Sequence, residues 1–169
     1  MNDAHWHLVI NHFPIIIPVI GSLVLIGGFV LKSDVIKRTA YVLFALGAIL
    51  AYPSKYTGEG AEEIAEKING VTKKMIHNHE EIAETFAKLS YLLGGLSLLA
   101  LWTNWKQKSF ANIVGIIVLV SAMFALYYAK QTGTSGGEIR HTEIRADYNS
   151  TEGAVPDGNM NQTGEGDDD

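Results

Sequence analysis

Four long apolar stretches, separated by polar connections, constrain the fold of this chain more than any other feature. A helix rises about 1.5 Å per residue, so roughly 20 apolar residues cross a hydrocarbon core of about 30 Å. Inside such a core only helices or closed barrels satisfy their own backbone hydrogen bonds. The predicted spans are residues 8–31, 39–56, 82–105 and 110–130. The sequence therefore predicts an all-α, integral membrane four-helix bundle in the lipid bilayer, formed by residues 1–145.

The prolines refine where these helices should begin, bend and end. We expect Pro14 to be tolerated near the start of the first helix, whereas Pro18 should bend it by removing an intrahelical bond. The second span should end near Pro53, and the third helix should begin in the 70s. The acidic stretch after the second span, residues 59–68, is amphipathic and could lie on the membrane surface.

The basic residues of the short connections predict the orientation in the membrane. Lys32, Lys37 and Arg38 crowd the first connection, and Lys106 with Lys108 occupies the tight turn before the fourth span. Short basic loops stay on the cytoplasmic side. We therefore expect a multi-pass protein of the bacterial inner membrane, with both termini on the outer, periplasmic side.

Composition excludes several classes of function. The chain has 169 residues and no cysteine, so thiolate metal sites, iron–sulfur clusters and covalently attached c-type haem are excluded. Its net charge of −5 and the lack of a basic patch argue against nucleic acid binding. No nucleophile elbow, phosphate loop or pair of intramembrane acids is present, so we expect no catalytic residues. Residues 146–169 are polar and acidic, which predicts a disordered C-terminal tail.

All six histidines fall on the predicted outer side. His12 lies one turn inside the first apolar stretch, where a polar ring needs a partner because lipid provides none. His79 opens the third helix on a face of small and apolar residues, so it should look into the bundle. These two side chains are the strongest candidate ligands for a cofactor or a metal. The alternative is that both histidines only satisfy local hydrogen bonds.

Further polar residues near the same membrane face could join such a site. The candidate metal ligands beside His12 and His79 are His77, Glu59 and Glu80, and Arg140 could meet the propionates of a haem. His77 should point outward with the acids of its helix. The Gly-rich segment after the fourth span, from Thr134 to His141, is either a plain exit turn or a lid that folds back.

The two helical hairpins follow a similar plan, which either a duplicated hairpin or coincidence would explain. Asn11-His12 opens the first helix, and Asn78-His79 opens the third. Thr57-Gly58-Glu59 follows the second span, and Thr132-Gly133-Thr134 follows the fourth. A true duplication would place His12 and His79 in equivalent positions about a pseudo-twofold axis.

At His12-Phe13-Pro14-Ile15, the four-span layout, and the run from Thr57-Gly58-Glu59 to His79-Glu80-Glu81, the chain resembles a known family. It is similar to the small bacterial membrane proteins that carry domain of unknown function 2231. The resemblance spans roughly residues 5–130 and reaches only His12 and His79 among the candidate ligands. Members of that family are sometimes joined to redox domains, which implies electron transfer.

Three hypotheses about function remain open. The first is a b-type haem or redox-metal protein that passes electrons to a quinone or a redox partner protein, with His12 and His79 gripping haem b. The second is a divalent-metal protein for zinc, copper or iron, either a binding protein or a transport accessory. The third is a structural membrane subunit without a cofactor. Glycine-lined spans would also permit a homodimer.

Overall fold

The computed structural model describes residues 2–145, and within them the chain forms helices joined by short connections, with no strand. Four helices are long and apolar enough to cross a membrane. The helices are α1 (Asp3–Ile10), α2 (His12–Val30), α3 (Asp34–Ala65), α4 (Lys73–Trp105), α5 (Ala111–Arg140) and the short η1 (Thr142–Ile144). The predicted all-α architecture is confirmed for this part of the chain, whereas the predicted tail at 146–169 lies outside it.

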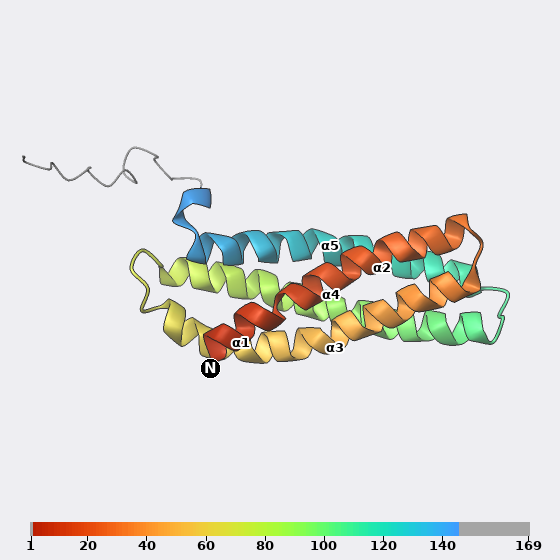
Figure 1. The fold of residues 1–169 in the computed structure, drawn as a ribbon, viewed down its shortest axis with the longest axis horizontal. Coiled ribbons are helices and arrows are strands. Elements are labelled where there is room, and N and C mark those ends of the chain that lie inside the picture. The colour runs from red at the N-terminus through yellow and green to blue at the C-terminus, as the bar shows by residue number, and fades with distance from the viewer. Residues whose placement is uncertain (1, 146–169) are drawn as a thin grey trace, which may run out of the picture.

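Helices α2 to α5 form an antiparallel bundle in which each helix packs beside the next one in sequence, and α5 returns to α2 (Figure 1). Helix α1 continues the line of α2 and packs against α3. The bundle therefore has two ends. The histidine end carries α1, the α3–α4 connection and the close of α5. The basic end carries the α2–α3 and α4–α5 turns.

The first helix is interrupted earlier than the sequence predicts. The break falls at Asn11, between α1 and α2, while Pro18 lies inside an unbroken α2. The helix already begins at Asp3, so Pro14 is an interior residue. It cannot donate to the carbonyl of Ile10, and its ring crowds that carbonyl. The interruption thus falls one turn before Pro14, and the bend at Pro18 stays a prediction.

The second and fourth helices run further than predicted. Helix α3 passes through Pro53 and ends only at Ala65, so Glu59 and its neighbours project from the bundle on a continuous helix. They do not form a separate stretch on the membrane surface. Helix α5 likewise continues through its glycines to Arg140, which corrects the expected exit turn. The predicted start of the third helix in the 70s is confirmed at Lys73.

Small residues let the helices approach closely around a core of Leu25, Tyr41, Phe44, Leu93 and Val118. A Cβ atom built at Gly94 on α4 would lie only 2.5 Å from the Cβ of Ala48 on α3. A Cβ atom built at Gly115 on α5 would likewise lie 2.5 Å from the hydroxyl oxygen of Tyr41. Without an intervening side chain at these points, the helices pack backbone to side chain.

The two turns at the basic end have the same local geometry. Lys32 and Gln107 each adopt a left-handed conformation, with φ of 51° and 50°. The next residue in each case donates back across the helix end, from Ser33 N to Gly28 O at 2.9 Å and from Lys108 N to Thr103 O at 3.0 Å. This is the Schellman pattern of helix termination. The hairpins α2–α3 and α4–α5 therefore turn in the same way, as a duplicated hairpin requires.

We expect Gly94→Ala to lower the free energy of unfolding by about 1–3 kcal/mol, because the new methyl group must push α4 away from Ala48. The matched control is the neighbouring Gly95→Ala, since a Cβ there meets nothing within 4 Å. That control should be neutral or slightly stabilising, because alanine favours a helix over glycine. Denaturant unfolding of the detergent-solubilised protein, followed by circular dichroism, measures both. Equal effects of the two variants would contradict the close α3–α4 contact.

Candidate functional site: paired histidines at one end of the bundle

His7 on α1 is the first histidine that the fold turns inward. Its half-buried ring packs against α3, where a Cβ at Gly58 would lie 3.3 Å from the ring. Its Nδ1 lies 3.0 Å from the carbonyl oxygen of Ser54 and 3.5 Å from the Oγ1 of Thr57. Because a carbonyl oxygen only accepts, Nδ1 carries the proton and donates it to Ser54. The Nε2 atom of the neutral ring therefore keeps its lone pair.

His79 on α4 is held in the same manner by α5. Its Nδ1 lies 2.9 Å from Ser135 Oγ, and that hydroxyl donates to the carbonyl of Thr132 at 3.2 Å. The serine oxygen is thus left to accept the proton of Nδ1, and Nε2 again keeps its lone pair. The ring also covers Gly136, where a Cβ would lie 2.9 Å away. This contact confirms that His79 looks into the bundle.

The two contacts match one another along the sequence. Each inward ring is the second histidine of a His-x-His motif, at residues 5–7 and 77–79. Each ring contacts a five-residue segment with the same pattern, which is a hydroxyl residue, any two residues, a second hydroxyl residue and a glycine. These segments are residues 54–58 of α3 and 132–136 of α5. The structure therefore equates His7 with His79 and Gly58 with Gly136. The expected register, which equated His12 with His79, is corrected by this arrangement.

Burial lowers the pKa of both inward rings, and the charge of His12 also lowers the pKa of His7. Desolvation lowers the pKa of His7 below its ordinary value of 6.5, against the opposing effect of the Ser54 hydrogen bond. Desolvation also lowers the pKa of His79, and the charge of His7 lowers it further. His7 lies in the first hairpin and His79 in the second, so a site that used both would draw one nitrogen from each hairpin. Neutral imidazole is the form that binds a metal ion.

The structure does not bring His12 to His79. The His12 ring is exposed, and its Nδ1 bonds the carbonyl of Leu8, across the break at Asn11, at 2.9 Å. This is the local hydrogen bond that the alternative hypothesis proposed for an interfacial histidine. The ring whose charge acts on His79 is His7 instead.

The other candidate ligands remain apart from the inward pair. His77 is exposed and lies 3.9 Å from Glu80 and 3.5 Å from Glu81, on the outer face of α4 as expected. Glu59 and Arg140 are exposed on α3 and at the last residue of α5. Within residues 2–145, no three His, Asp or Glu side chains gather closely enough to hold a metal ion by themselves. Two imidazoles are therefore the core of the candidate site.

The short segment after α5 turns back onto this end of the bundle, whereas the predicted lid or exit turn, Thr134 to His141, continues helix α5 to Arg140. Arg145 donates from Nε to the carbonyl of Glu138 at 2.8 Å and from Nη1 to the carbonyl of Gly70 at 2.9 Å. It thereby ties the close of α5 to the α3–α4 connection. His141 is exposed and bonds Glu143 at 2.8 Å, outside the inward pair.

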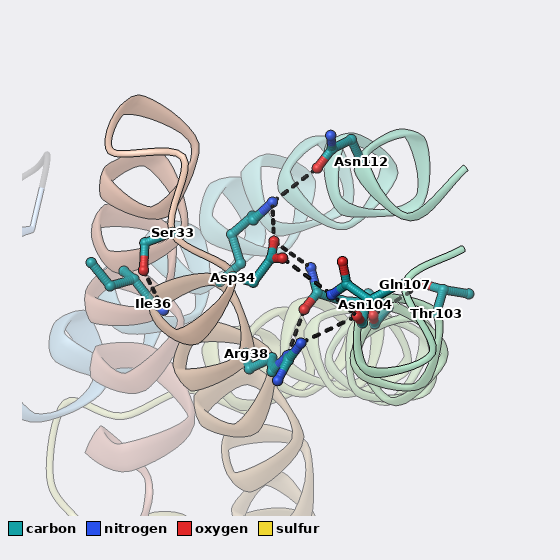
Figure 2. A network of polar contacts seen from close by, with 10 residues as sticks. Ser33, Asp34, Ile36, Arg38, Thr103, Asn104, Gln107 and Asn112 are labelled. Carbon is teal, nitrogen blue, oxygen red and sulfur yellow. Dashed lines mark hydrogen bonds and ion pairs between the residues drawn. The ribbon is translucent and has the colours of Figure 1, made fainter. Parts of the chain in front are cut away.

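A second polar cluster, at the basic end, was not predicted as a unit (Figure 2). Asp34 at the start of α3 binds Lys37 at 2.7 Å, and Asn104 at the end of α4 donates to the same carboxylate at 3.0 Å. Lys37 is only 6% exposed and also reaches Asn112 on α5 at 2.9 Å. Its hydrogen bonds, together with those from Asn104 and Gln107, hold the pKa of Asp34 well below its usual range. These charges and amides therefore link the ends of three helices, α3, α4 and α5.

Comparisons with known proteins assign no family or function to the chain. No family model, curated protein or solved structure matches the chain. The resemblance to the family of domain of unknown function 2231 stays a prediction. The function is therefore argued from the inward pair, His7 and His79, and from the helices that position it.

We expect the protein to lose stability as the pH falls from 7 to 5. The unfolded chain takes up protons near the ordinary histidine pKa of 6.5, whereas His7 and His79 in the folded protein resist protonation to lower pH. Below 6.5, protons therefore favour unfolding. His79→Asn should weaken this pH dependence, and the exposed His77→Asn should not. Thermal denaturation in detergent with a chelator present measures the effect, and an equal response of both variants would contradict it.

Proposed function

We propose that the chain is an integral membrane protein that binds a transition-metal centre through His7 and His79 and acts in electron transfer. The observation that carries the proposal is the matched orientation of the two rings. Each donates Nδ1–H to a backbone carbonyl or to a carbonyl-bound hydroxyl, which leaves Nε2 as a bare nitrogen donor. Metal-binding histidines are held in this way by partners outside the coordination sphere.

The surface of the bundle supports the membrane part of the proposal. Large apolar side chains are exposed on every long helix, with Leu23 66% exposed on α2, Ile49 65% on α3, Leu98 57% on α4 and Ile113 62% on α5. A belt of this kind suits lipid and would be unfavourable in water. The basic residues of the two tight turns support a cytoplasmic basic end. The histidine end would then lie at the outer face of a bacterial inner membrane.

Haem b and a bare metal ion both coordinate imidazole nitrogen, and the donor count favours haem. His7 and His79 would hold the haem iron, which would supply one-electron chemistry. A bare zinc, copper or iron ion prefers further donors, and no third residue is gathered at the pair within the described part of the chain. Arg140, exposed at the end of α5, is the candidate partner for the haem propionates. The electron acceptor would be a quinone or a redox protein at the outer face.

The test is an absorption spectrum of the purified full chain, expressed with haem supplied, before and after reduction by dithionite. We expect a Soret band with reducible α and β bands. His7→Ala and His79→Ala should each remove most of the bound haem, because each takes away one axial ligand. His12→Ala, which removes an exposed ring bonded to the carbonyl of Leu8, is the matched control and should keep the spectrum.

Other outcomes separate the alternatives. A colourless protein that retains zinc, copper or iron by elemental analysis, and loses it in His7→Ala and His79→Ala, would assign a bare metal ion to the same nitrogens. Loss of haem in His12→Ala with retention in His7→Ala would restore the pairing of His12 with His79. If both inward variants fold and bind as wild type does, the histidines have a structural role only.

A further inference from the structure

A shallow hollow lies on the flank of α3 at the basic end, well away from the histidines. Its volume is about 350 Å³, and most of its lining is apolar. The lining residues are Val35, Arg38, Thr39, Val42 and Leu43. Val35 and Val42 are exposed, and they lie where α3 passes from the charged turn into the apolar span. The hollow therefore offers an apolar wall with one cation at its edge.

Arg38 is held rigidly at that edge. Its Nε donates to Asn104 Oδ1 at 2.6 Å and its Nη2 to the Asn104 carbonyl at 3.3 Å, so α4 fixes the guanidinium (Figure 2). Asn104 is itself only 3% exposed and is anchored to Asp34. An arginine has five N–H donors, so these two bonds leave others for a ligand. An arginine held in this way loses little side-chain entropy when it binds an anion.

The charge of Arg38 is not neutralised by the protein within residues 2–145. Asp34, the acid of this cluster, forms its ion pair with Lys37, and no carboxylate lies within ion-pair distance of Arg38 in that part of the chain. The surroundings are also basic. The other cations on the two turns and their flanking residues are Lys32, Lys37, Lys106 and Lys108. An anion at Arg38 would therefore meet a net positive field.

From these observations we infer that the Arg38 hollow seats one anionic phospholipid of the membrane leaflet at the basic end. An acyl chain would lie against Val35, Val42 and Leu43, and the headgroup phosphate would accept hydrogen bonds from Arg38. Phosphate suits the planar donor fork of arginine, and basic pockets on transmembrane helices recognise anionic headgroups. A second copy of the chain is a poorer occupant, because an apolar helix face would bury the Arg38 charge without a counter-ion. The inference rests on the membrane part of the proposed function and is independent of the metal centre.

The experiment is native mass spectrometry of the full chain in micelles that contain equal amounts of dioleoyl phosphatidylglycerol and dioleoyl phosphatidylcholine. We expect one phosphatidylglycerol molecule to be retained in preference to phosphatidylcholine. Arg38→Gln should reduce that preference on the order of tenfold, as the loss of a charge-assisted contact predicts. Lys106→Gln, which removes an exposed cation of the same end outside the hollow, is the matched control and should keep the preference.

A second variant tests the hollow without touching the polar cluster. Val42→Trp fills the apolar wall at an exposed position and should displace the lipid even though Arg38 and Asn104 remain in place. If Arg38→Gln and Lys106→Gln reduced the preference for phosphatidylglycerol equally, the inference would be overturned, and the lipid would be held only by the general positive charge of the basic end. Retention of the lipid in Val42→Trp would place it elsewhere, and a lipid-free dimer broken by Val42→Trp would assign the hollow to a second copy. A chain that stays monomeric in buffer without detergent would overturn the membrane part of the proposed function itself.

Discussion

Close contact between helices, permitted by small residues at the crossing points, is the constraint on which the remaining structure depends. Gly94 meets Ala48, and Gly115 meets the Tyr41 hydroxyl and the Phe29 ring, so close approach at these crossing points depends on the missing side chains of the glycines. Dispersion and close packing rather than a hydrophobic force hold helices together in lipid. A middle packed in this way has no room for charged groups, and the polar chemistry of the protein is therefore pushed to its two ends.

The two ends use polar residues in opposite ways. At the basic end, Asp34, Lys37 and Asn104 satisfy one another and fix the ends of three helices. At the histidine end, His7 and His79 are satisfied on one nitrogen only, and the other nitrogen of each ring keeps its lone pair. A cluster whose members satisfy one another favours rigidity, whereas oriented lone pairs favour ligand binding. The metal hypothesis therefore belongs to the histidine end, whereas the lipid hypothesis rests on Arg38, which keeps free N–H donors beside the satisfied cluster.

The internal correspondence of the two hairpins is most visible in contacts between helices. Both hairpins reverse through a left-handed residue at the basic end, at Lys32 and Gln107. Both place a histidine of one helix over a hydroxyl and a glycine of the next, as His79 does with Ser135 and Gly136. The signal was present in the sequence as two His-x-His motifs and two hydroxyl–glycine patterns. It was obscured by the more conspicuous Asn-His pairs, which do not occupy equivalent positions.

The sequence by itself determined four apolar helices, their order and the gathering of histidines at one end, because long uncharged stretches between polar turns predict such helices whatever their packing. It also determined that His79 faces inward, since the small face of its helix is continuous. Only the tertiary structure decided between His7 and His12. Residues five apart on a helix point about 140° away from each other, and the break at Asn11 shifts the two helical segments further. The side of α1 that packs against α3 depends on that break and on the space that Gly58 leaves for the His7 ring. A local sequence pattern cannot predict this contact, because it is formed between helices that are far apart in the sequence.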